Sequence, residues 1–318
     1  MGQSKSKMLS PDAISVKKKG FLYYLKRDWQ LYALLLLPMA FIIVFKYFAY
    51  TGLSVAFLDY KIGKGYAGSK FVGLKVFEKV FKHRDFGKAV ANTLLLNVLD
   101  LLFSFPMPII LALLLNEIRV KWFKRVTQTL LYLPHFLSWV VIGATAYAMF
   151  ATNSGVINTL IANAGKSPIP FLQEDAWWLF SYILIGIWQT MGWGTIIYFA
   201  ALSGVDPQLY EAAEIDGARK WKQMINITLP AITPTIVIML ILNCNNIVNA
   251  GFDQIFMLYS ALVYDVADII DTYVYRIGIQ KADYSFSTAA GMFKSVIALV
   301  MILIVNFVAK KTGNEGIW

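Results

Sequence analysis

Residues 31–50 read LYALLLLPMAFIIVFKYFAY, and this stretch decides the fold class. About 20 mainly apolar residues are needed to cross roughly 30 Å of hydrocarbon. Five further stretches have this length and character: 93–116, 130–150, 177–199, 232–254 and 288–309. Each is predicted to be a helix, because a segment in lipid must satisfy its own backbone hydrogen bonds. The sequence therefore predicts an all-α polytopic membrane protein with six transmembrane helices.

The composition excludes an ordinary soluble protein. Of the 318 residues, 58 % are hydrophobic and 15 % charged, whereas soluble domains have about 45–50 % and about 25 %. The one cysteine, Cys244, excludes an intrachain disulfide and a Cys-rich metal site, so we expect no metal and no cofactor on this chain. We predict a single membrane domain, residues 1–318, with an N-terminal cytoplasmic segment at 1–30 and a cytoplasmic loop at 200–231.

The distribution of Lys and Arg predicts the orientation. With the N-terminus inside, the inner segments carry sixteen of these residues and the outer segments eleven, and cytoplasmic loops are usually enriched in them. We therefore predict a multi-pass protein of the bacterial plasma (inner) membrane with both termini cytoplasmic. The net charge of +10 then predicts contact with membrane lipid and none with nucleic acid.

The first outer loop, residues 51–92, contradicts this distribution, because it carries eight Lys and Arg against three acidic residues. Two interpretations stay open. A cationic loop would attract an acidic cargo within a Debye length of about 8–10 Å. Alternatively, an amphipathic helix in the loop places Leu74, Phe77 and Phe81 in lipid, with its lysines at headgroups or facing a partner protein.

The connection between the fourth and fifth spans, residues 200–231, is predicted to form a two-helix cytoplasmic hairpin. Asp206 and Pro207 can begin the first helix as its N-cap and first helical residue. Gly217 permits the left-handed turn that ends this helix. The second helix is expected to break at Leu229-Pro230, just before the chain re-enters the membrane.

The hairpin has a fixed spacing of residues in chain order: Glu211, Ala212, Ala213, then Gly217 after three residues, Ile227 after nine more, and Leu229 and Pro230. This pattern resembles the cytoplasmic signature of the permease subunits of ABC importers. Segments 34–45, 92–116 and 251–256 are similar to the maltose-type permeases, in their oligo- and polysaccharide branch with its alginate-type members.

The resemblance implies a type I importer with two permeases, two ATPase subunits and an extracellular or periplasmic solute-binding protein. We expect a heterodimer with a second, similar permease. This chain has no GxxxxGK[ST] loop and is expected not to be an enzyme, so ATP and Mg would be held by the partner ATPase subunits. In that family the hairpin docks into the ATPase, which gives the roles expected here: Glu211 pairs with a basic residue, Ala212 and Ala213 allow close approach, Gly217 sets the bend, and Ile227 and Leu229 bury apolar surface.

Polar side chains within the predicted spans are candidates for a substrate pathway, because they are costly in hydrocarbon. On the fifth span four of them share one helical face: Asn243, Asn246, Asn249 and Asp253. We interpret this stripe as the lining of a hydrophilic cavity for sugar hydroxyls. Hydrogen bonding between helices is the alternative.

Four further residues of the spans have open interpretations. Asp100 is expected to pair with a cation or to face the cavity. Lys294 is expected either to snorkel outward or to reach the cavity. Trp193 is deep enough for packing or for sugar stacking, and His135 is interpreted as a structural histidine with its hydrogen bonds satisfied.

These observations predict a permease of a binding-protein-dependent importer that moves an oligosaccharide inward, powered by a separate ATPase. The cationic loop favours an acidic cargo such as an alginate- or uronate-type oligomer. An ion-gradient-driven secondary sugar transporter is the alternative, but it would need paired intramembrane carboxylates, and the spans offer few. An intramembrane enzyme is disfavoured, because the sequence has no HExxH or GxSxG motif.

Overall fold

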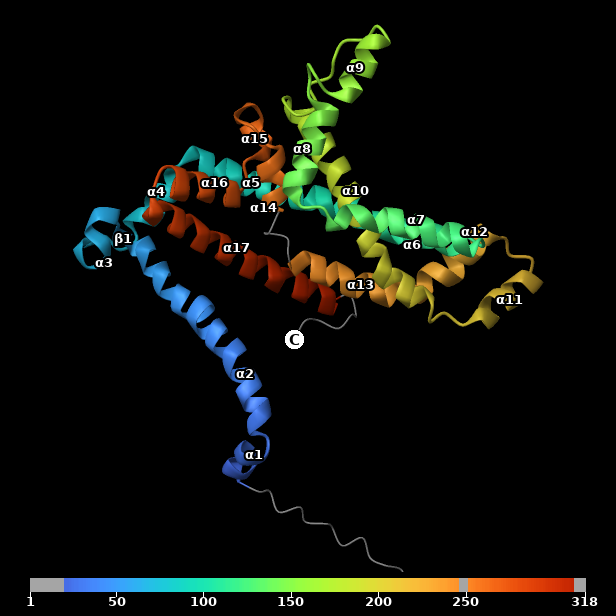
Figure 1. Ribbon diagram of the computed structural model, residues 1–318, viewed down its shortest axis with the longest axis horizontal. Helices are drawn as coiled ribbons and strands as arrows, with labels where there is room; N and C mark the ends of the chain where they lie inside the picture. Colours follow the sequence, from blue (N-terminus) through green and yellow to red (C-terminus); the bar gives the residue numbers. More distant parts are fainter. Residues whose placement is uncertain (1–19, 246–250, 312–318) are drawn as a thin grey trace, which may run out of the picture. The chain divides into compact units, whose positions relative to one another are not determined.

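The computed structural model describes residues 20–245 and 251–311 (Figure 1). Contacts within the chain divide it into two compact units, residues 1–54 and 55–318, which are described separately. The first unit holds α1 (Phe21–Arg27) and α2 (Trp29–Ile42), and α2 continues as the π-helical η1 (Ile43–Tyr47) and the 3-10 segment η2 (Phe48–Phe57). No residue of α2 is buried within the chain. A helix that is apolar all round and unpacked belongs in a membrane or against another protein.

The second unit is organised around α10 (Asp175–Leu202), which packs along α6 and also contacts α7, α13 and α14. The long helix beside it consists of α5 (Arg84–Leu99), the π-helical η4 (Asp100–Ser104) and α6 (Pro106–Glu117). One core cluster joins α6, α10 and α13 (Leu229–Asn245), and its buried members are Ile109, Ala112, Leu113, Tyr198, Leu202 and Ile232. The hydrophobic faces of these helices therefore meet around α10.

Among the described residues, five helices are long and apolar enough to cross a membrane: Trp29–Phe57, Arg84–Glu117, Asp175–Leu202, Lys220–Asn243 and Tyr284–Ile304. A bent pair, Lys121–Phe136 and Trp139–Phe150, would bring the number to six if it forms one span. The prediction of an all-α polytopic membrane protein is confirmed.

The third predicted span is not a straight helix, because its two halves meet at 102°. The first half is α7 (Lys121–Tyr132) with the 3-10 turn η5 (Leu133–Phe136), and the second is α8 (Trp139–Phe150). Pro134 lies in the turn and removes a backbone donor. Leu137 is extended, and the Ser138 hydroxyl accepts from the Val141 N–H at 3.4 Å as N-cap of α8. The chain therefore begins a new helix where we expected a continuous one.

The fifth predicted span, 232–254, is also interrupted. The helix α13 is described to Asn245, and α14 (Phe252–Leu258) is a separate helix. Gly251, the residue before α14, has φ −48° and ψ 89°, which is not helical. Asp253 therefore does not continue the helical face of Asn243, and the prediction of one continuous stripe is wrong for these two residues.

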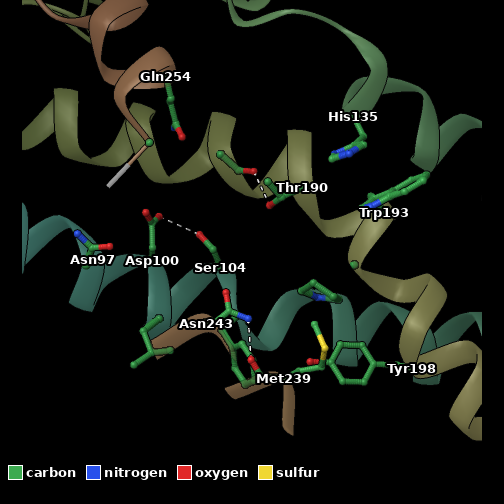
Figure 2. A pocket seen from close by; sticks show the side chains of 16 residues that line it. Asn97, Asp100, Ser104, His135, Thr190, Trp193, Tyr198, Met239, Asn243 and Gln254 are labelled. Carbon is green, nitrogen blue, oxygen red and sulfur yellow. Dashed lines mark hydrogen bonds between the residues drawn. The ribbon is translucent and has the colours of Figure 1, made fainter. Parts of the chain in front are cut away.

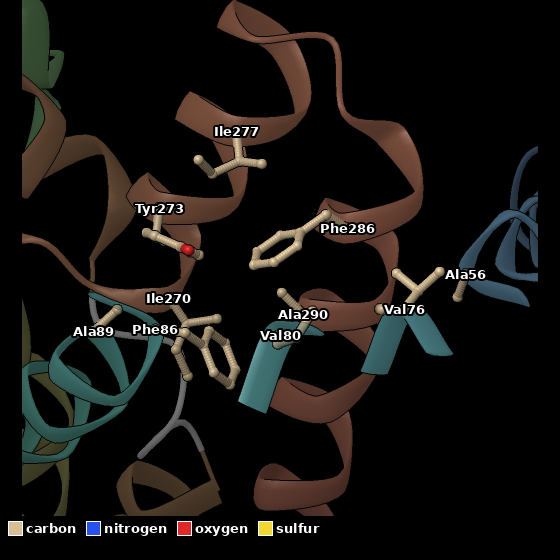
Figure 3. Packing of buried hydrophobic residues seen from close by; sticks show 11 residues of the cluster. Ala56, Val76, Val80, Phe86, Ala89, Ile270, Tyr273, Ile277, Phe286 and Ala290 are labelled. Atoms are coloured by element: carbon tan, nitrogen blue, oxygen red, sulfur yellow. The ribbon is translucent and has the colours of Figure 1, made fainter. Parts of the chain in front are cut away.

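The segment after α14 forms short helices that pack against α5 and α17. These are η7 (Ala261–Val263), α15 (Tyr264–Ala267), α16 (Ile270–Tyr275) and the π-helical η8 (Arg276–Gln280), followed by α17 (Tyr284–Lys311). Figure 3 shows how Ile270, Tyr273 and Ile277 meet Phe286 of α17 and Phe86 of α5 in one hydrophobic cluster. This cluster is the hydrophobic core of the region that contains a second pocket.

The first loop of the second unit contains the helix α4 (Lys75–Lys82) and a two-stranded antiparallel ribbon of β1 (Leu58–Asp59) and β2 (Lys70–Phe71). The same loop contains two more short helices, η3 (Ile62–Lys64) and α3 (Gly65–Gly68). The short helix α9 (Val156–Asn163) lies in a later loop. The buried face of α4 is Val76 and Val80.

The interpretation that places Leu74, Phe77 and Phe81 in lipid is wrong in part. Phe77 packs against the protein core, whereas Phe81 remains mostly exposed and makes one edge contact with Phe293 at 4.9 Å. Leu74 is exposed, and so are the lysines of α4. The loop helix is therefore fixed to the protein by its apolar face and presents its cations outward.

Candidate functional site

The hairpin of residues 207–228 begins as predicted. The helix α11 (Pro207–Ile215) has Pro207 at its first position, and the Asp206 carboxylate accepts from the Gln208 N–H at 2.9 Å. A carboxylate at this position satisfies an orphan donor and complements the positive end of the helix. The local sequence therefore determines where this helix starts.

Gly217 ends α11 in the left-handed conformation, with φ +75°. The Ala218 N–H donates to the Ala213 carbonyl at 2.8 Å, and the Gly217 N–H donates to the Glu214 carbonyl at 3.1 Å. These are the two bonds of a Schellman motif, which commonly has Gly at this position. The predicted role of Gly217 in the turn is confirmed.

The second helix of the hairpin does not break at Leu229-Pro230. From α12 (Lys220–Gln223) the chain passes through the π-helical η6 (Met224–Thr228) directly into α13, which starts at Leu229. The wider π-helical turn precedes Pro230 and accommodates the missing N–H and the ring of the proline. The hairpin is thus joined rigidly to the helix that follows it.

The exposed face of the hairpin carries Glu211, Ala212 and a group of large apolar side chains. Ile215 is 87 % exposed and Trp221 is 69 % exposed. Within the described part of the chain, Glu211 has no ion-pair or hydrogen-bond partner. Such a surface, apolar with a free carboxylate, is typical of a protein-binding site.

Two residues of the signature lie differently from their expected role. Leu229 packs against the core cluster of α6, α10 and α13, and Ile227 is half-buried. Leu229 therefore anchors the hairpin to its own bundle. Sequence reasoning gave no docking role to Ile215 or Trp221, although a large apolar residue in an otherwise polar, exposed segment is itself a signal.

A cavity of about 370 Å³ with polar and apolar lining residues lies between α10, the α5–η4–α6 helix, α13 and the start of α14 (Figure 2). Its polar or aromatic lining residues are Asn97, Asp100, Ser104, Phe105, His135, Thr190, Trp193, Tyr198, Asn243 and Gln254. Asp100 is the only charged residue among the described residues that line it. Two of the predicted pathway residues, Asp100 and Asn243, therefore share one cavity.

Asp100 faces this cavity and is held by two hydroxyl groups. Tyr182 donates to its Oδ2 at 2.7 Å, and Ser104 donates to its Oδ1 at 3.2 Å. No cation pairs with it among the described residues. Of the two interpretations of Asp100, the structure supports the cavity-facing one.

Two amide side chains of the cavity, Asn243 and Gln254, donate a hydrogen bond through the amide nitrogen and leave the amide oxygen available. The Asn243 Nδ2 donates to the Met239 carbonyl at 2.9 Å, and the Gln254 Nε2 donates to the Tyr182 carbonyl at 2.8 Å. In the described part of the chain, neither amide oxygen accepts a hydrogen bond. These oxygens are available to hydroxyl donors of a ligand.

His135 and Trp193 form a stacked pair at the other end of the cavity, with ring centroids 4.7 Å apart and an interplanar angle of 5° (Figure 2). The Nδ1 atom of His135 is buried and has no hydrogen-bond partner among the described residues. The interpretation of His135 as a satisfied structural histidine is therefore wrong. An aromatic pair beside free polar groups suits a ligand with both apolar faces and hydroxyls.

The remaining predicted pathway residues lie elsewhere. Asn246 and Asn249 are outside the described residues. Asp253 is exposed on α14 and does not line the cavity. Lys294 neither snorkels nor reaches the cavity, because its Nζ is bound to both carboxylate oxygens of Asp271, at 2.8 and 2.7 Å. Gln254 is a cavity residue that the predicted stripe did not include.

The chain matches a known protein family over most of its length. Residues 88–314 match the family described as the binding-protein-dependent transport system inner membrane component. The chain belongs to this family. It is therefore a permease subunit of an ABC importer, and it belongs to a family of inner-membrane subunits that are not themselves enzymes.

Two relatives from Bacillus subtilis (strain 168) match nearly the whole chain. Protein LplB is 44 % identical over 309 residues, which is 97 % of each chain. The polygalacturonan/rhamnogalacturonan transport system permease protein YteP is 44 % identical over 302 residues, covering 95 % of this chain and 94 % of YteP. Similarity over this length extends well beyond the hairpin signature.

A solved structure is similar in fold as well as in sequence. A chain in the crystal structure of a bacterial alginate ABC transporter, in complex with an alginate pentasaccharide-bound periplasmic protein, matches with a TM-score of 0.84 and 38 % identity. The match covers 94 % of this chain and all of that chain. The shared fold therefore extends over nearly the whole chain.

Proposed function

We propose that this permease carries an oligosaccharide inward through the cavity around Asp100, and more narrowly an acidic, uronate-type oligosaccharide. The observation that carries the proposal is the lining of the cavity. Free amide oxygens and a hydroxyl-bound carboxylate lie opposite a stacked aromatic pair. Sugar rings combine hydroxyl donors with apolar C–H faces, so these groups suit them.

The acidic cargo rests on different observations. The relative YteP is named for polygalacturonan and rhamnogalacturonan, and the structural neighbour transports alginate. In this chain the exposed face of α4 presents Lys75, Lys79 and Lys82. Lys82 is the partner of Glu78 at 2.6 Å, which leaves an excess of cations on this face. The cations act on the approach of the cargo and not inside the cavity, because no Lys or Arg is among the described residues that line it.

The proposal includes the partners and the orientation. The hairpin lies on the cytoplasmic side and docks one of two ATPase subunits, which hold ATP and Mg, while this chain binds no cofactor. A second permease completes the pathway as a heterodimer, and a periplasmic or extracellular binding protein delivers the cargo. Both termini are cytoplasmic. The family favours this ATP-driven scheme over the ion-gradient-driven alternative.

The test uses the complete transporter in lipid vesicles, with binding protein loaded with a neutral or a uronate oligosaccharide. We expect ATP-dependent uptake, and faster uptake of the uronate. Replacing Lys75, Lys79 and Lys82 by Gln should lower uronate uptake most strongly at low salt, because exposed charges are screened at high salt. The matched control replaces two exposed lysines of other loops, Lys166 and Lys281, by Gln.

The outcomes separate the two levels of the proposal. Uptake of neutral oligosaccharides alone, unchanged by the Gln substitutions, would overturn the acidic cargo and leave the oligosaccharide importer. No ATP-dependent uptake of any oligosaccharide would overturn both.

A further inference from the structure

A second pocket of about 370 Å³ lies between α14, α16, η8 and α17. Phe252, Asp271, Tyr275, Tyr284 and Ser287 are among its lining residues, and none of these lines the cavity around Asp100. Consecutive residues at the start of α14 line the two sites, because Gly251 lines the cavity around Asp100 and Phe252 lines this pocket.

The charged group of this pocket is a carboxylate that is fixed and still accessible. Asp271 accepts from Lys294 through both of its oxygens, at 2.8 and 2.7 Å, and its side chain remains 26 % exposed. Lys294 is 17 % exposed and is not a lining residue. Each carboxylate oxygen can accept two hydrogen bonds, so Asp271 can accept further donors while Lys294 holds it in place.

Aromatic rings line the same pocket as this carboxylate. The rings of Phe252 and Tyr275 lie 5.9 Å apart, and Tyr284 lies 6.1 Å from Tyr60 of a neighbouring pocket. Among the described residues, the hydroxyls of Tyr275 and Tyr284 make no hydrogen bond. Phenol groups without partners can bind sugar hydroxyls, and their rings can stack on the C–H faces of a sugar.

We propose that this Asp271 pocket is a second sugar subsite, which holds another ring of the oligosaccharide whose leading rings occupy the cavity around Asp100. This inference rests on the proposed function. Asp271 accepts hydroxyl donors of the ring, and Tyr275 and Tyr284 contact its face and edge. Because a carboxylate repels a carboxylate, the ring presents its hydroxyls and not a uronate group to Asp271. Lys294 is a positioning residue that acts through Asp271.

This arrangement predicts a dependence on the length of the cargo. We expect a disaccharide to occupy the cavity alone and a hexasaccharide to reach both sites. In the reconstituted complete transporter, Asp271→Asn should raise the half-saturating concentration of binding protein loaded with hexagalacturonate about tenfold, equivalent to ~1.4 kcal/mol. The value for digalacturonate should change less than twofold.

Further variants keep the test independent of folding. Asp271→Asn alone leaves Lys294 without its partner, so the double variant Asp271→Asn/Lys294→Met removes both charges together. Tyr275→Phe removes only a hydroxyl and should show the same length dependence to a smaller extent. Lys294→Arg keeps a cation beside Asp271 and should restore hexasaccharide uptake relative to Lys294→Met.

The matched control is Asp265→Asn, which breaks the exposed ion pair with Lys88 at 2.5 Å in the same region. Asp265 is not among the residues of the pocket, so this variant should show no length dependence. Equal losses for both lengths in the Asp271 variants, or no loss for either, would overturn the subsite. Failure of the unmodified transporter to take up either oligosaccharide would instead overturn the proposed function.

Discussion

Gly217→Val should weaken the docking of the ATPase subunit to the hairpin without disturbing the transmembrane helices. Gly217 has φ +75°, and a Cβ at this position would meet no atom within 4 Å. The penalty is therefore conformational and does not come from a clash. A left-handed conformation costs an L-residue about 1–2 kcal/mol, and the β-branched side chain of Val makes it a genuine outlier. If docking requires this turn, the affinity should fall about five- to thirtyfold.

The assay measures binding of the purified ATPase subunit to the two-permease complex in nanodiscs, together with ATP hydrolysis stimulated by loaded binding protein. Gly217→Asn is the matched control, because Asn adopts the left-handed conformation more readily than other residues, and it should retain most of the affinity. A Gly217→Val protein that binds the ATPase and couples hydrolysis to uptake as well as the unmodified protein does would contradict this prediction.

Three further predictions concern single side chains. Glu211→Lys should abolish stimulated ATP hydrolysis while leaving membrane insertion intact, because reversing a charge at a docking surface opposes the partner's charge. The control is Glu117→Lys, an exposed charge reversal outside the hairpin. Coupled transport by Glu211→Lys would contradict the docking role. Tyr182→Phe should destabilise the complex by about 1–3 kcal/mol in a thermal melt, because Asp100 loses a hydrogen bond at 2.7 Å inside the bundle. An unchanged melting temperature would show that this hydrogen bond does not contribute to stability. Burial raises the pKa of Tyr273 to about 12, so this tyrosine ionises at a lower pH in the unfolded chain than in the native protein. The protonated tyrosine therefore favours the folded state at neutral pH, and this contribution to the free energy of unfolding is lost as the pH rises toward 12. Tyr273→Phe should make stability in this alkaline range less dependent on pH, and an equal dependence in both proteins would contradict the shift.

The architecture was largely predictable from local sequence. A run of about 20 apolar residues becomes a helix in a membrane because no other local conformation satisfies the backbone in lipid. The start and end of α11 were equally predictable, because Asp206, Pro207 and Gly217 act through their own backbone neighbours. Where the prediction of a local break was wrong, at Pro230, a π-helical turn offered a solution that residue preferences do not specify.

Which polar groups contact one another depends on the packing of helices that are far apart in the sequence. Tyr182 and Asp100 are 82 positions apart, and Lys294 and Asp271 are 23 apart, so no periodicity connects them. The sequence identified Asp100 and Lys294 as costly in lipid, but it could not say that one faces a cavity while the other is neutralised by a carboxylate. Helix formation in lipid depends on each segment's own hydrogen bonds, whereas the pairing of buried charges depends on how distant helices pack. For this reason a helical membrane permease with a surface hairpin follows from local segments of the sequence, whereas the packing of distant helices sets which side chains share a site.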